Sequence, residues 1–231
     1  RPDPMFPETR WTLVIRAGRA GIGEPRALEE LLSLYWRPVW VYLRARGARA
    51  EDAEELTQEL FAELFAGAGS LNVGADRGRF RTWLKACAAH HHLRWLESGR
   101  AMKRGGGARF VAMDTALLEG LAAATEDPDA AFDAAWAATV MERALSRLRA
   151  EYDSGERVGD FVLLERFFGA GEAPSYRGVA AEAGMSLPQL KAFVHRGRVR
   201  FRELVAEEVR DTVGSSADGD AEVTALFQAL R

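Results

Sequence analysis

The sequence predicts an all-α protein of two small helical domains joined by a flexible acidic linker. Ala, Leu, Arg and Glu dominate its 231 residues, and no stretch shows the alternation of β-branched and polar residues that is typical of strands. Apolar residues instead recur at spacings of three and four in several separate segments. A chain of this length, 48% hydrophobic, can bury one moderate core or two small ones, so length alone does not decide the number of domains.

The first strong helical pattern covers residues 24–46. Before it, residues 11–17 are expected to form one short helix that a run of glycines ends. Within 24–46 a wide apolar stripe indicates a core helix, formed by Leu28, Leu31, Leu32, Tyr35, Trp36, Val39, Tyr42 and Leu43. Pro38 lies inside this stripe and is expected to kink or divide the helix.

A second helix, expected after Gly47, is strongly acidic. Its apolar face consists of Leu56, Leu60, Phe61, Leu64 and Phe65. Its other side chains include six acids with no base between them, namely Glu51, Asp52, Glu54, Glu55, Glu59 and Glu63. These acids are either a solvated face, favoured near the helix start by the dipole, or a docking face for a basic partner surface.

A basic helix is expected after the glycine-rich loop at residues 67–78. That loop is not a phosphate-binding P-loop, because no Gly-Lys-Ser/Thr follows it. Between residues 76 and 109, nine basic residues oppose two acids, which gives 9 − 2 = +7. Phe80, Trp83, Leu84, Cys87 and His91 share one helical side, and Arg77, Arg81 and Lys85 share another. Aromatic residues beside a basic row suit stacking on unpaired bases, although Phe80 and Trp83 are equally suited to a core.

The sequence indicates no metal site, no internal disulfide and no membrane-spanning helix. His90, His91 and His92 fan out by about 100° per residue on a helix, so they cannot chelate one ion. The single Cys87 excludes an internal disulfide and fits a reducing compartment. No apolar run approaches the roughly 20 residues that a membrane helix needs. We therefore expect a cytoplasmic protein without a cofactor or a metal.

The remaining chain divides into a linker, a helical pair and a tail. Residues 111–141 contain no Lys or Arg but six acids, which predicts an acidic linker with at most one short helix. Helices are expected again over 134–151 and around 161–168, and residues 223–231 could form a short terminal helix. The net charge of −3 hides this segregation of acidic and basic segments, which suggests partners of opposite charge.

Residues 175–203 have the pattern of a DNA-binding helix-turn-helix. Tyr176, Val179, Ala180 and Ala183 form one apolar face, and Gly184 ends that helix. Ser186 and Pro188 then start a second helix, whose packing side consists of Leu187, Leu190, Val194, Gly197 and Phe201. No acid occurs from 186 to 202, as a helix that enters a major groove requires. The alternative is an amphipathic hairpin with a solvated basic face.

Three stretches together resemble the extracytoplasmic-function sigma factors of bacterial RNA polymerase, within the sigma-70 superfamily. DAEELTQELF at residues 52–61 is similar to the signature of the family's second conserved region. FRTWL at 80–84 is similar to the start of its melting helix, and the helix-turn-helix resembles its fourth region. The implied domains are an N-terminal extension (1–9), a region 2 promoter-melting domain (10–104), a flexible linker (105–136), a region 4 helix-turn-helix domain (137–210) and a tail (211–231).

The resemblance also implies a role for individual residues. The acids and amide that would dock on the core polymerase are Asp52, Glu54, Glu55, Gln58 and Glu59. The residues that would contact and melt the −10 element are Leu71, Arg77, Arg79, Arg81, Trp83, Lys85, Cys87 and His90. Those of the recognition helix that would meet the −35 element are Ser186, Gln189, Lys191, Ala192, His195, Arg196 and Arg200. The family's further partners include anti-sigma factors and other regulators, and the sequence identifies none for this chain.

The sequence departs from the family's pattern at three positions. The family usually has Asn at the position of His90, often Asp at that of Arg94, and commonly Arg at that of Phe193. Two other classes of function remain as alternatives. One is a helix-turn-helix regulator whose N-terminal domain binds a ligand or a partner. The other is an enzyme that would use His90 to His92 in metal-assisted hydrolysis.

Overall fold

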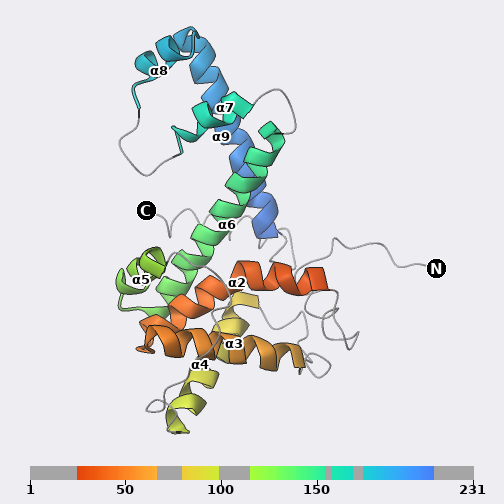
Figure 1. The fold of residues 1–231 in the computed structure, drawn as a ribbon, viewed down its shortest axis with the longest axis vertical. Helices are drawn as coiled ribbons and strands as arrows, with labels where there is room; N and C mark the ends of the chain where they lie inside the picture. Colours follow the sequence, from red (N-terminus) through yellow and green to blue (C-terminus); the bar gives the residue numbers. More distant parts are fainter. Residues whose placement is uncertain (1–24, 67–79, 99–114, 154–157, 169–173, 211–231) are drawn as a thin grey trace, which may run out of the picture. The chain divides into compact units, whose positions relative to one another are not determined.

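The computed structural model describes residues 25–66, 80–98, 115–153, 158–168 and 174–210, and these form helices connected by turns (Figure 1). The helices are α2 (Pro25–Ala45), α3 (Ala50–Ala66), α4 (Phe80–Glu97), α5 (Thr115–Ala123), α6 (Pro128–Asp153), α7 (Val158–Glu165), α8 (Tyr176–Glu182) and α9 (Leu187–Arg210). The predicted all-α class is confirmed. The expected helices over 11–17 and 223–231 and the loop at 67–78 lie outside the described residues.

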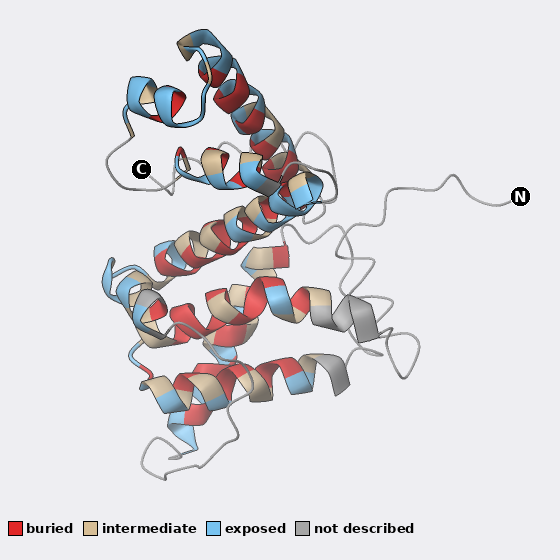
Figure 2. Ribbon diagram, turned by 45° about the horizontal axis from the view of Figure 1, so that its top comes forward, coloured by how far each residue is buried: buried red, intermediate tan, exposed pale blue. Residues whose placement is uncertain are grey.

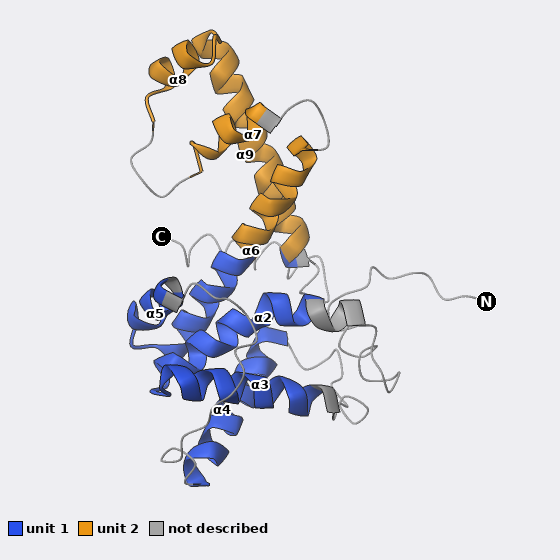
Figure 3. Ribbon diagram, viewed as in Figure 1, with its two compact units in different colours: residues 1–139, 209–231 blue, residues 140–208 orange. Residues whose placement is uncertain are grey.

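The helices form two compact units, and the border between them falls inside α6, between Thr139 and Val140 (Figure 3). The first unit contains α2 to α5 and the beginning of α6, and the second contains the rest of α6, α7, α8 and α9 as far as Glu208.

Helix α2 is the central element of the first unit, because α3, α4 and α5 all pack against it. Its buried residues, coloured red in Figure 2, include Leu34, Tyr35, Val39, Trp40, Val41 and Leu43. Pro38 does not divide the helix, which runs without interruption from Pro25 to Ala45. Aromatic pairs join it to its neighbours. Tyr35 meets Phe80 of α4 edge-on, with 4.9 Å between the ring centroids.

Helix α5 and the first turns of α6 belong to the same core, although the sequence predicted a flexible linker there. Leu118 is buried, and Phe132 and Trp136 are almost completely buried. Arg44 of α2 also holds α5, by donating from Nε and Nη2 to the two carboxylate oxygens of Glu119 at 3.0 and 2.6 Å. Residues 115–123 and 128–136, for which the sequence predicted at most one short helix, thus belong to two helices that buried side chains stabilise.

The second unit has a core of its own, to which each of its four helices contributes. The largest fully buried side chains are Leu148 of α6 and Phe161 and Leu164 of α7, and Val179 of α8 and Leu190 and Val194 of α9 complete the core. Edge-on contacts of Tyr152 with Phe161 and Phe193 join α6 to α7 and to α9. This core holds α8 and α9 in position for the arrangement described next.

Candidate nucleic-acid interface

Helix α8 has well-formed ends. At its start, the Ser175 hydroxyl accepts a hydrogen bond from the Gly178 amide. At its end, Gly184 adopts a left-handed φ of 63°, which a residue without Cβ does at no steric cost. The Met185 amide then donates to the Ala180 carbonyl and the Gly184 amide to the Ala181 carbonyl. These two bonds form a Schellman motif, so the predicted tight turn between the two helices is confirmed.

A reciprocal pair of hydrogen bonds starts helix α9. The Gln189 amide donates to the Ser186 hydroxyl at 3.4 Å, and the Gln189 side-chain oxygen accepts from the Ser186 amide at 2.8 Å. This is a capping box. A Ser followed three residues later by a Gln is the sequence signature of this capping box. The predicted DNA contact of Gln189 does not include this role. Its side chain therefore has a structural role before any ligand binds.

The two sides of α9 differ in burial as the sequence predicted. Leu190, Val194, Gly197 and Phe201 are buried against the unit's core. The exposed side chains near the helix start are Gln189, Lys191, Ala192, His195 and Arg196, with Ser186 exposed just before it. Within the part of the chain that the structure describes, no ion pair involves Lys191 or Arg196. A cationic face without acidic partners is thus presented beside the turn.

Two further observations explain how α9 is held. A Cβ atom at Gly197 would lie 2.5 Å from a terminal carbon of Leu164, so only glycine allows α7 and α9 to approach this closely. Phe193, which stands where the family commonly has Arg, is buried beside Tyr152. That departure therefore places a core contact where the family commonly has a cation.

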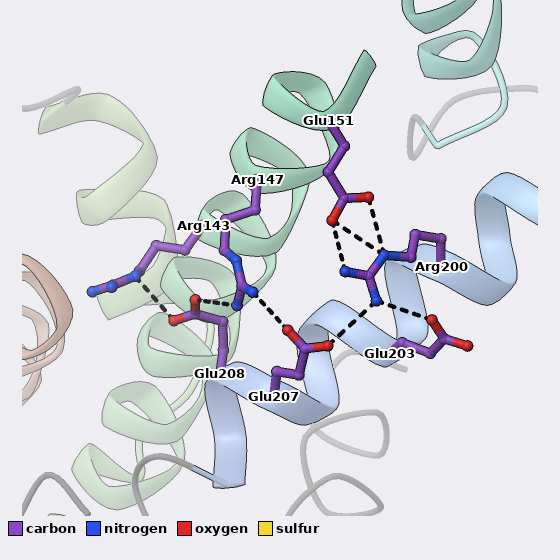
Figure 4. Close-up of polar contacts among 7 residues, drawn as sticks. All are labelled: Arg143, Arg147, Glu151, Arg200, Glu203, Glu207 and Glu208. Carbon is purple, nitrogen blue, oxygen red and sulfur yellow. Dashed lines mark hydrogen bonds and ion pairs between the residues drawn. The ribbon is translucent and has the colours of Figure 1, made fainter. Parts of the chain in front are cut away.

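Arg200 belongs to a chain of ion pairs between α6 and α9, shown in Figure 4. Three arginines and four glutamates take part, namely Arg143, Arg147, Glu151, Arg200, Glu203, Glu207 and Glu208. The Glu208 side chain is only 5% exposed and accepts from two guanidinium groups. The hydrogen bond from Arg200 holds the pKa of Glu151 below its usual value. Within the predicted DNA-contact set, Arg200 thus differs from Arg196 because acids already surround it.

The predicted docking acids lie along α3, and their surroundings differ. Glu55 is exposed, Asp52 and Glu54 are half-buried, and no ion pair joins any of them to another described residue. Glu59 lies 3.5 Å from the His91 ring. The next acid along the helix, Glu63, accepts from Arg94 at 2.8 Å, which lowers the pKa of Glu63. The Asp expected at position 94 is thus replaced by a cation that pairs with α3.

The predicted −10 residues on α4 are not one uniform surface. Arg81 and Lys85 are mostly buried beneath acids of α6, whereas His90 is exposed. Trp83 is half-buried and packs on Phe80, with 5.4 Å between the ring centroids. Cys87 is half-buried as well, and burial raises the pKa of its thiol. Leu71, Arg77 and Arg79 lie outside the described residues.

The three consecutive histidines differ in burial. His91 and His92 are buried and His90 is exposed. Among the described residues there is no group of His, Cys, Asp and Glu side chains that could hold a metal ion. Nor does any described helix combine the length and the apolar character needed to cross a membrane.

Part of the first unit matches a known protein family. Residues 31–101, which include most of α2 and all of α3 and α4, match the family description "Sigma-70 region 2". The chain therefore contains a sigma-70 region 2 domain. It is similar to the RNA polymerase sigma factor YlaC of Bacillus subtilis (strain 168), with 24% identity over 178 residues, or 77% of this chain and 91% of the relative. No solved structure gives a significant match. The resemblance inferred from the three motifs is thus confirmed.

Proposed function

We propose that this sigma factor brings core RNA polymerase to promoters by docking through α3, and that it reads two promoter elements with α4 and α9. The sigma-factor role itself follows from the family. The division of labour among residues is the proposal. Asp52, Glu54, Glu55, Gln58 and Glu59 would bind the polymerase, the α4 surface the −10 element, and the exposed side of α9 the −35 element.

The observation that carries the proposal is the presence of a region 2 fold and a helix-turn-helix in one chain. In the second unit, the exposed side of α9 carries cations and no acids near its start, as a helix that reads duplex DNA requires. In the first unit, α3 presents Asp52, Glu54 and Glu55, which form no ion pair with another described residue. Two surfaces of opposite charge suit two partners of opposite charge, namely DNA and a basic protein surface.

Each unit is expected to bind its promoter element weakly by itself. On the polymerase, both units face the same DNA, so binding of one raises the effective concentration of the other without new contacts. The consequence is conditional recognition. The protein should select promoters as part of the holoenzyme and bind duplex DNA poorly alone.

Run-off transcription with core polymerase on genomic fragments tests the proposal. The expected result is a set of discrete start sites that depend on the added protein and share upstream sequences at a fixed spacing. A gel shift with and without core enzyme distinguishes the regulator alternative. Tight binding to a palindromic duplex by the protein alone, with no sigma-dependent transcript, would contradict the proposal.

A further inference from the structure

Arg81 and Lys85 of α4 are paired with the first turns of α6. Arg81 Nη1 lies 3.1 Å from Asp133 Oδ1, and the Lys85 ammonium lies 3.4 Å from a carboxylate oxygen of both Asp129 and Asp133. The Arg81 and Lys85 side chains are only 11% and 16% exposed. All four residues belong to the first unit. The cations expected to contact DNA therefore already have carboxylate partners.

Aromatic side chains of α6 also lie close to the same two cations. The Arg81 guanidinium lies 3.8 Å from the ring centroid of Trp136, and the Lys85 ammonium 5.6 Å from that of Phe132. Each cation is thus in contact with a carboxylate and an aromatic ring of one helix. A nucleic-acid strand offers a similar combination, because its phosphates are anionic and its bases are aromatic. The first turns of α6 therefore make the same kinds of contact with Arg81 and Lys85 that a nucleic-acid strand would make.

We propose that residues 128–136 act as an acidic cover that competes with the DNA strand for Arg81 and Lys85. This inference rests on the proposed function, because it concerns the −10 surface of α4. In the free protein the cover lowers the affinity of α4 for single-stranded DNA. On the promoter, phosphates replace the carboxylates of Asp129 and Asp133.

The burial of the cover fits such an exchange. The Asp129 and Asp133 side chains are 61% and 38% exposed, so they can turn into solvent while the helix remains folded. Phe132 and Trp136, in contrast, are almost completely buried and anchor α6 in the core. The exchange therefore needs movement of carboxylates and cations, and no unfolding of α6.

The test compares full-length Asp133→Asn and Asp129→Asn with a matched control, Glu126→Gln. Glu126 is an exposed acid just before α6 and outside the cover, and it has no ion pair with a described residue. Binding of a fluorescein-labelled single-stranded oligodeoxynucleotide is measured by anisotropy over a range of salt concentrations. Each Asn variant should bind about two- to fivefold more tightly than the control. Its salt dependence should also steepen by roughly 0.7 for each additional phosphate that the variant binds.

Equal affinities and equal salt slopes for the three variants would overturn the cover. Because the Asp129 side chain is mostly exposed, Asp129→Asn is not expected to disturb the fold. Thermal unfolding of each variant checks this. Run-off transcription by the wild-type holoenzyme separates the two proposals. If the wild type initiates and the Asn variants bind like the control, only the cover is wrong. If the wild type does not initiate, the proposed function itself fails.

Discussion

Arg200 of α9 and Glu151 of α6 form a forked ion pair, in which Nε and Nη2 of the guanidinium lie 2.6 to 3.2 Å from the carboxylate oxygens. The same guanidinium reaches Glu203 and Glu207 on its own helix. A side chain held by three acids is poorly placed to contact phosphate or base. We therefore expect it to anchor α9 on α6, and its predicted contact with the −35 element stays a prediction.

Replacing Arg200 by Ala should lower stability and leave promoter selection largely intact. Exposed ion pairs contribute about 0.2–1 kcal/mol each, so the loss of unfolding free energy should be small and should shrink at high salt. Urea unfolding at two salt concentrations measures it. The −35 affinity of the holoenzyme is measured in parallel. A loss of affinity as large as that of Arg196→Ala would return Arg200 to the DNA-contact set.

The pairing of Arg200 also shows where prediction from sequence reaches its limit. Helical spacing correctly placed Arg200 away from the apolar face of α9, but its partner Glu151 lies 49 residues earlier in the chain. Spacing within one helix contains no information on such a distant neighbour. Within α9 itself, the buried and exposed sides and the turn at Gly184 were predictable, because local periodicity and a left-handed glycine determine them.

The acidic linker shows a different limit. Phe132 and Trp136 are four residues apart and share a helical face, yet the alanines and acids around them suggested a solvated tether. Their burial depends on α2 and α4, as the contacts of Phe132 with Tyr42 and of Trp136 with Arg81 show, and is not encoded in the composition of the segment. The same tertiary contacts cover Arg81 and Lys85, whose partners no local pattern could indicate.

Arg196 is expected to contribute directly to promoter recognition. If its guanidinium reads a base, Arg196→Ala should cost about 1–3 kcal/mol at one position of the −35 element and relax specificity there. If it holds a phosphate, binding should weaken evenly over all sequences, and the salt slope should fall by about 1. Holoenzyme binding to a set of single-base promoter variants distinguishes these outcomes. Arg202→Ala, an exposed cation farther along α9, serves as the control. Unchanged binding on every promoter would remove Arg196 from the interface.

Charge reversal on α3 should abolish association with core polymerase. Glu54→Lys combined with Glu55→Lys brings two cations against a basic surface, and like charges in contact cost several kcal/mol, or about 100-fold or more in affinity. A pull-down with core enzyme measures the loss. The matched control is Glu126→Lys with Glu165→Lys, which changes the charge equally at exposed positions outside α3. Equal retention of both double variants would contradict docking through this face.

Gly197→Ala should destabilise the second unit, although alanine is the better helix former. The added Cβ would lie 2.5 Å from the Leu164 side chain, and overpacking of this kind costs about 1–3 kcal/mol. Urea unfolding followed by circular dichroism measures the loss. Gly178→Ala is the control, because a Cβ there meets only Ser175 at an ordinary 3.8 Å. In a Leu164→Ala background the penalty at Gly197 should disappear. A penalty that persists there would show that close packing is not its cause.

The first unit should lose stability as the solution is acidified, because of His92. This ring is 3% exposed, and burial lowers its pKa, with Arg46 and His91 contributing positive charge nearby. An unfolded histidine binds a proton near pH 6.5. Below that value the unfolded chain therefore takes up more protons than the folded one, and the free energy of unfolding falls as the pH falls.

Urea unfolding followed by tryptophan fluorescence at about pH 7.5 and about pH 5.5 checks this expectation, on either side of the histidine pKa. The sequence has no tryptophan within residues 140–208, which form the second unit, so the signal reports unfolding of the first. His92→Gln cannot titrate and should show a smaller loss over the same interval. His195→Gln, at an exposed position of the second unit, should behave like the wild type. If His92→Gln loses as much stability as the wild type, another group is responsible for the pH dependence.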